Sequence, residues 1–198
     1  SFDYAKKLLQ GNSSTLLGMN IGSPNISDPN HQSLIDIIIQ LCKQMTKFPD
    51  APIKDILDLC SSLYSTYKTP LLHDNIANLV ARCAFSPLYP TMNKKMKEKS
   101  DWVISKGEDV CEELNGPLEQ IIKFGKLTKN ILRHFMNLLT TPLIARNSRS
   151  IFTYLRKNCP ELLPSLIPTL PSDTKFDLFT AVSKEAITSE QLQLLILL

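Results

Sequence analysis

Eight basic side chains between Pro117 and Cys159 are the residues of this sequence best suited to recognition chemistry. The segment contains one acidic residue, Glu119, although the whole chain has a formal net charge of only +3. Such a local excess of positive charge favours an acidic partner, either an acidic protein surface or the phosphates of RNA or DNA. The eight are Lys123, Lys126, Lys129, Arg133, Arg146, Arg149, Arg156 and Lys157.

The spacing of the first four cations predicts that they share one exposed stripe. On one continuous helix over residues 118–140, they lie on the side opposite the apolar residues. We expect this stripe and the cations that follow it to bind an acidic protein, with a nucleic-acid-binding helical module as the alternative. Few aromatic residues accompany the cations, and only Tyr154 is placed to stack on a base. A solvated helix face without any partner also accounts for such a run of charge.

No catalytic motif is present in the sequence. The run Gly125-Lys126-Leu127 has leucine where a phosphate-binding loop needs Ser or Thr. Asp55 and Asp58 share a helix face, but that face is wholly polar, which indicates solvated surface. No histidine has a partner at metal-ligand spacing; the three are His31, His73 and His134. We therefore expect no enzyme, with no catalytic residues, no cofactor and no metal site.

The cysteines and the hydrophobic runs indicate an intracellular protein, nuclear or cytoplasmic. There are five cysteines, an odd number, and Cys42, Cys60 and Cys83 each fall on the apolar side of a predicted helix. We expect them to be buried thiols in a reducing compartment. No apolar run approaches the roughly 20 residues of a membrane span, and no basic-apolar leader precedes the chain. We expect no membrane association.

Helical periodicity runs through nearly the whole chain, and no segment alternates as a strand does. Only 6 glycines against 13 prolines argue against a turn-rich β-sandwich. Apolar residues in the first long helix cover so wide an arc that we expect neighbours on two of its sides. Asp50 is expected to cap the second helix. The main predicted helices span about residues 31–47, 52–67, 71–85, 118–140, 142–158 and 172–184.

Short connections between these helices predict antiparallel hairpins. About eight to ten helices are expected, with hairpins recurring at roughly 40 residues. The arrangement is similar to α-solenoids of the HEAT or armadillo kind in architecture only; an irregular helical-repeat domain is the alternative. We expect one domain over residues 1–198, with a sub-boundary near 86–117 and a flexible loop at 11–30.

The ends of the sequence favour a domain excised from a larger polypeptide. The chain opens with Ser1 and ends in a Leu-rich stretch, residues 194–198, that lacks a helix-capping residue. Together these patterns predict a non-enzymatic protein–protein interaction or scaffold domain of a larger intracellular protein. Its partner-binding residues would be the eight cations.

Overall fold

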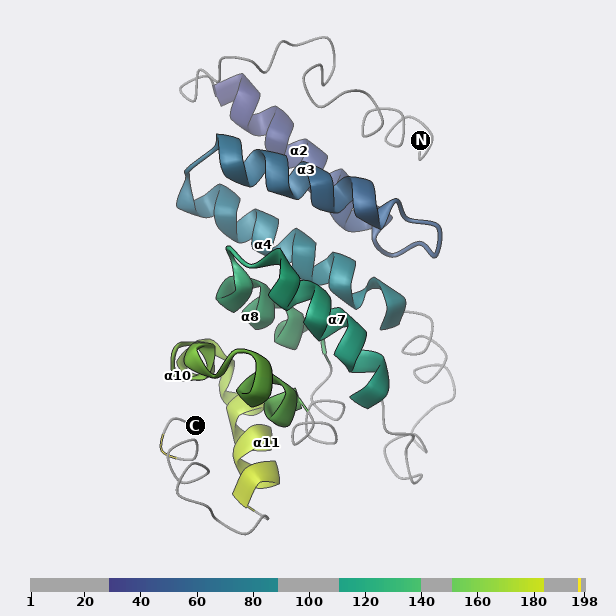
Figure 1. Cartoon of the computed structure of the whole chain (residues 1–198). Coiled ribbons are helices and arrows are strands. Elements are labelled where there is room, and N and C mark those ends of the chain that lie inside the picture. Colours follow the sequence, from purple (N-terminus) through teal and green to yellow (C-terminus); the bar gives the residue numbers. More distant parts are fainter. Residues whose placement is uncertain (1–28, 89–110, 140–150, 184–195, 197–198) are drawn as a thin grey trace. The chain divides into compact units, whose positions relative to one another are not determined.

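The chain is all-α in the part that its structure describes. A computed structural model describes residues 29–88, 111–139, 151–183 and 196 (Figure 1). All regular structure in these ranges is helical, which confirms the predicted fold class. The stacking of hairpins into a solenoid stays a prediction. The loop at 11–28 and the Leu-rich end, Ile196 excepted, lie outside the described residues.

The chain divides into two compact units, Ser1–Ser86 (unit 1) and Pro87–Leu198 (unit 2). The division falls at the amino-terminal edge of the segment 86–117, where the sequence predicts a sub-boundary. A single domain over the whole chain stays a prediction, and each unit is described by itself.

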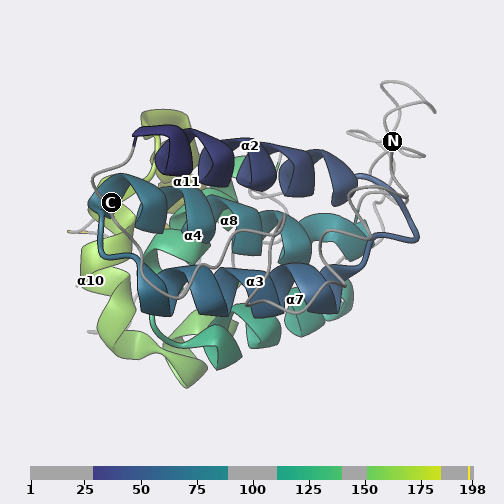
Figure 2. The ribbon, with the colours of Figure 1, turned by 90° about the horizontal axis from the view of Figure 1, so that it is seen from above.

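The described part of unit 1 consists of three successive α-helices. They are α2 (Pro29–Met45), α3 (Ile53–Thr66) and α4 (Pro70–Phe85), and a short 3₁₀ turn, η2 (Ser86–Leu88), follows. Both α2 and α3 pack against α4, and Figure 2 shows the ribbon of α4 between the other two. The three predicted helices are confirmed, with each end within two residues of its predicted position.

The core of unit 1 is built around α4. The apolar residues at helical spacing along this helix are buried, Cys83 among them as predicted: Leu72, Ile76, Leu79, Val80, Cys83 and Phe85. From α3, Ile56 and Cys60 complete the packing. Pro70 lies in the first turn of α4. Backbone N–H groups in a first turn have no acceptor within the helix, so proline, which has no N–H, costs no helical hydrogen bond there.

Among the described residues of unit 1, helix α2 buries a single face, and neighbours on two of its sides stay a prediction. Its buried residues recur at the spacing of a single face: Ile35, Ile39, Cys42 and Met45. Ile37 and Leu41 are 57% and 45% exposed. Within unit 1 the main packing partner of α2 is α4, and one neighbouring helix covers one stripe.

The start of α3 corrects a second prediction. Asp50 is exposed and does not cap this helix. Pro52 is the N-cap residue, and its carbonyl accepts the first helical hydrogen bond from the Ile56 N–H at 3.0 Å. Proline fits this boundary because its ring fixes φ and the position needs no N–H donor.

Unit 2 begins, in its described part, with the helical pair α7 (Cys111–Phe124) and α8 (Thr128–Leu138), which pack on each other. Helical residues 151–158 follow. A continuous helical run then comprises η3 (Pro160–Leu162), α10 (Leu163–Leu166) and η4 (Ile167–Thr169), and α11 (Ser172–Ser183) comes after it. Helix α10 packs on α8. The run starts at Pro160, as the sequence requires for Pro160 and Pro164 to share one helix.

The predicted continuous helix over 118–140 is wrong, because the chain turns at Gly125. Gly125 has a φ of 76°, a left-handed conformation that favours glycine. Its N–H donates to the Ile122 carbonyl at 3.1 Å, and the Lys126 N–H donates to the Phe124 carbonyl at 2.9 Å. The Thr128 hydroxyl donates to the Gly125 carbonyl at 2.7 Å and begins α8.

Helix α7 also begins earlier than predicted. It starts at Cys111 and continues through Gly116 and Pro117, which the sequence places at a break. Pro117 has no N–H, so the helix lacks one hydrogen bond at this position. Its ring is buried and contributes apolar contacts to the core. The core of this pair includes Leu118, Ile121 and Phe135.

Candidate partner-binding surface

The predicted basic residues that the structure describes lie on three helical segments of unit 2 and in one turn, and do not follow one helix. Lys123 lies in the last turn of α7, Lys126 in the turn after it, and Lys129 and Arg133 on α8. Arg156 and Lys157 lie in the last turn of the helical residues 151–158. Arg146 and Arg149 lie outside the described residues.

Lys129 and Arg133 preserve part of the predicted stripe. They are four residues apart on α8, so they share one side of the helix. That side borders the buried face, and both side chains are half-buried. A guanidinium nitrogen of Arg133 donates to Nε2 of His134 at 3.1 Å; Nε2 is the acceptor because arginine only donates. The buried face of α8 consists of Thr128, Ile131, Leu132, Phe135 and Met136.

Lys123 is paired with the one acidic residue of the basic segment. Its Nζ lies 2.7 Å from Oε1 of Glu119, one helical turn earlier, and both side chains are largely exposed. The hydrogen bond from Lys123 to Glu119 and the attraction of that carboxylate raise the pKa of Lys123. In the sequence the glutamate precedes the lysine by four residues, and this spacing on a helix favours ion pairs.

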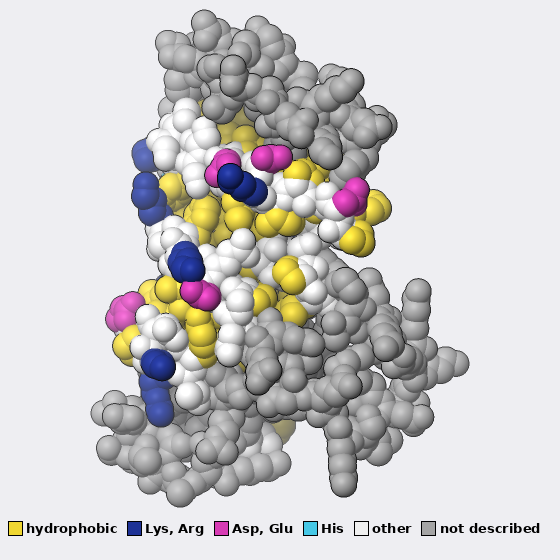
Figure 3. All heavy atoms as spheres, turned by 45° about the vertical axis from the view of Figure 1, so that its right-hand side comes forward, with side chains coloured by type: hydrophobic (Ala, Val, Ile, Leu, Met, Phe, Trp, Pro, Cys, Tyr) yellow, Lys and Arg dark blue, Asp and Glu magenta, His cyan; other side chains and the backbone are white. Residues whose placement is uncertain are grey.

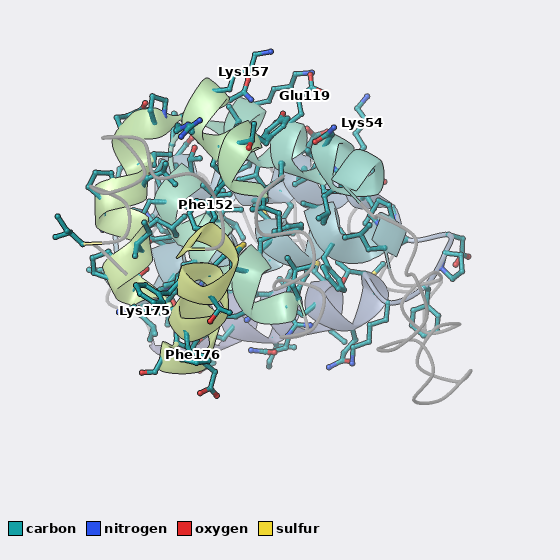
Figure 4. All side chains as sticks on the ribbon, turned by 90° about the horizontal axis from the view of Figure 1, so that it is seen from below. Lys54, Glu119, Phe152, Lys157, Lys175 and Phe176 are labelled. Carbon is teal, nitrogen blue, oxygen red and sulfur yellow. The ribbon has the colours of Figure 1, made fainter. Side chains whose placement is uncertain are left out.

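Tyr154, in the helical residues 151–158, lies near the exposed side of α7. Burial raises the pKa of Tyr154, with a further contribution from the Glu119 carboxylate, while Lys123 opposes the shift. Tyr154 therefore lies within electrostatic range of the Lys123–Glu119 pair. Figure 4 shows Lys157 and Glu119 projecting at the same edge of this unit. Cations that are far apart in the sequence, Lys123 and Lys157, thus reach a common region.

Besides Lys123, the basic segment has three exposed cations in its described part. They are Lys126, Arg156 and Lys157. Figure 3 draws one face of the molecule, on which lysine and arginine side chains lie among acidic, polar and apolar ones.

The thiols of unit 1 are buried, as predicted for Cys42, Cys60 and Cys83. Burial raises the pKa of Cys42 to about 11 and also raises the pKa of Cys60 and Cys83. At neutral pH all three are protonated, and a thiol in this state is a poor nucleophile and metal ligand. In the described ranges, no group of three or more His, Cys, Asp or Glu residues is placed to hold a metal ion.

His73 has a structural contact in the α3–α4 connection. Its Nε2 lies 2.7 Å from the backbone carbonyl of Tyr67, and because a carbonyl only accepts, Nε2 carries the proton. The imidazole also packs on the Tyr64 ring, with 4.4 Å between centroids. His73 therefore joins the end of α3 to the start of α4.

A polar cluster that no sequence motif indicates lies where α2 meets α4. It contains Lys43 from α2 with Asn75, Asn78 and Arg82 from α4. The only local signal is the spacing of three polar residues on α4, at 75, 78 and 82, along one side of a helix that is otherwise strongly apolar.

Comparison with known proteins gave no match to a family model, to a curated protein or to a solved structure. Within the ranges that the structure describes, no helix combines the length and hydrophobicity needed to cross a membrane.

Proposed function

We propose that the chain is a non-enzymatic interaction domain that binds an acidic protein surface through the cations of unit 2. The observation that carries the proposal is the set of exposed basic side chains, Lys126, Arg156 and Lys157, together with the half-buried pair Lys129 and Arg133. Within the segment 117–159 the single acidic side chain, Glu119, is already paired with Lys123. The segment thus has a large excess of positive charge, which attracts carboxylates.

One feature favours a protein partner over a nucleic acid. Tyr154, the one aromatic residue expected to stack on a base, is half-buried, and stacking needs an open ring face. A helical nucleic-acid-binding module is the second candidate, since the same cations would attract phosphates.

The cysteines support a scaffold that works inside the cell, in the nucleus or cytoplasm. Cys42, Cys60, Cys83 and Cys159 are buried and free of disulfides. Free thiols in a folded core are typical of reducing compartments.

The test compares an acidic peptide with an oligonucleotide of equal charge. Fluorescent decaglutamate and a single-stranded RNA are titrated with the full chain and with a triple variant, Lys126→Glu, Arg156→Glu and Lys157→Glu. We expect the triple variant to bind the peptide at least about tenfold more weakly, because three attractive charges become repulsive. Peptide affinity of the native chain should also fall as salt is added.

The matched control reverses three exposed lysines of unit 1, Lys47→Glu, Lys54→Glu and Lys68→Glu. Equal peptide affinity in the native chain and the unit 2 variant, with both folded by circular dichroism, would overturn the proposal. Equal losses in the two triple variants would also overturn it, because only net charge would then matter. RNA binding much tighter than peptide binding would instead support the nucleic-acid-binding module.

A further inference from the structure

The edge between α2 and α4 brings two cations and two amides together in unit 1. Lys43 on α2 donates from Nζ to Oδ1 of Asn75 at 3.3 Å. One turn further along α4, Nε of Arg82 donates to Oδ1 of Asn78 at 3.0 Å. All four side chains are half-buried, so they line an accessible edge that is partly shielded from water.

The hydrogen bonds engage some donors of these groups and leave others for an external acceptor. The Asn75 amide turns its oxygen to Lys43, so its NH₂ group points elsewhere and can donate. The Nε of Arg82 is engaged by Asn78, so Nη1 and Nη2 are the nitrogens able to form a bidentate pair. Two parallel N–H donors from one guanidinium match the two oxygens of a carboxylate or phosphate group.

The surroundings of Lys43 contain charges of both signs. Burial lowers the pKa of Lys43, and repulsion from Arg82 lowers it further, while Asp74 and Asp36 act in the opposite direction. Arg82 and the two carboxylates therefore all lie within electrostatic range of Lys43. Asp36 is also held by Gln32, whose Nε2 lies 3.4 Å from its Oδ1.

We propose that Lys43 and Arg82, assisted by the Asn75 amide, form an oxyanion-binding site that takes a carboxylate or phosphate group at the α2–α4 edge. The site lies in unit 1 and involves none of the unit 2 cations, so it does not rest on the proposed function. A free ion must compete with Asp36 and Asp74 for the cations. We therefore expect a free ion to bind with a dissociation constant on the order of 1 mM, the range of a single polar contact site.

The test follows the side-chain N–H signals of Arg82 and Asn75 by nuclear magnetic resonance in the full chain. Sodium phosphate and sodium acetate are titrated separately, with sodium chloride replaced so that ionic strength stays constant. We expect a saturable shift of the Arg82 Nε–H signal and about a tenfold weaker apparent affinity in Lys43→Gln. Lys43→Arg keeps the charge and should retain most of the affinity.

Lys54→Gln is the matched control, since Lys54 is an exposed lysine on α3 of the same unit. It should leave the titration unchanged. Saturation with both anions supports a site for which a carboxylate suffices, and saturation with phosphate alone supports the same site with a preference for phosphate. A shift that rises linearly without saturation, or an affinity equal in Lys43→Gln and the native chain, would overturn the proposal.

Discussion

The Ser86 hydroxyl donates a hydrogen bond of 2.9 Å to the backbone carbonyl of Thr46, forty residues earlier in the chain. Thr46 follows the last residue of α2, and Ser86 follows the last residue of α4. The last carbonyls of a helix have no partner within it, so this bond satisfies one such group. Thr46 is fully buried, and its own hydroxyl donates to the Lys43 carbonyl at 2.9 Å. The two helices therefore end side by side and run in the same direction.

Replacing Ser86 with alanine should destabilise unit 1. The change leaves the buried Thr46 carbonyl without its donor, which we expect to cost about 1–2 kcal/mol. Urea denaturation of the full chain measures the loss. Ser65→Ala is the control, because Ser65 is exposed and bonds only within its own helix; equal effects of the two changes would show that the Thr46–Ser86 contact does not stabilise the unit.

Two isoleucines on α2 should differ sharply in their contribution to stability. Ile39 is fully buried and Ile37 is 57% exposed. Ile39→Ala should cost about 2–5 kcal/mol, whereas Ile37→Ala should change the free energy of unfolding by no more than about 0.5 kcal/mol. Chemical denaturation of both variants measures the two losses in the free energy of unfolding. A large loss in Ile37→Ala would mean that α2 is covered on two sides after all.

Gly125 should be essential to the turn between α7 and α8. A Cβ there would meet only the Lys123 carbonyl at 3.9 Å, an ordinary contact, so the cost of Gly125→Ala is the left-handed backbone. We expect a loss of about 1–2 kcal/mol. Gly125→Asn should lose less, because asparagine adopts this conformation more readily. Thermal unfolding of both variants measures the difference, and equal losses would contradict a backbone cause.

Removing the Glu119 carboxylate should strengthen binding to an acidic peptide. Glu119→Gln releases Lys123 from its 2.7 Å ion pair and removes a negative charge beside the candidate surface. The pair is exposed, so the melting temperature should hardly change. Fluorescence titration with decaglutamate gives the affinity. Glu161→Gln makes the same charge change elsewhere in unit 2, and an equal gain there would attribute the effect to net charge alone.

The buried thiols should make the chain less stable in alkaline solution. Burial raises the pKa of Cys42 from its ordinary value of 9.0 to about 11, so the folded state retains a proton that the unfolded chain releases. This stabilisation is complete below pH 9 and is lost as the pH rises through 11. It amounts to on the order of 3 kcal/mol for Cys42.

Denaturation at pH 8, 9 and 10 tests this pH dependence. Cys42→Ala is expected to be less stable at pH 8, because it leaves a small cavity, yet to lose stability more slowly between pH 9 and 10. Lysines and tyrosines titrate in both proteins, so the difference between the two slopes isolates the thiol. Parallel slopes would show that Cys42 is accessible to water in the folded chain.

Periodicity in the sequence was sufficient to predict the helices of unit 1 and the inward face of α4. Both follow from local rules, because an apolar stripe at helical spacing is favourable only where it is buried against another part of the protein. The burial of Cys42, Cys60 and Cys83 follows from the same pattern. The Lys123–Glu119 pair is local as well, and its four-residue spacing was a sufficient signal.

Three features depended on the tertiary structure. A glycine in an apolar periodic segment is compatible with a continuous helix or with a helix end, and packing of α7 on α8 selects the turn at Gly125. The apolar residues of α2 exceed what one neighbour can cover, so only the position of α4 determines that Ile39 is buried and Ile37 exposed. Lys43 and Arg82 are far apart in the sequence, and nothing local indicates that they meet. Side-chain spacing determines which residues share a face, whereas the partner of that face depends on how the helices pack.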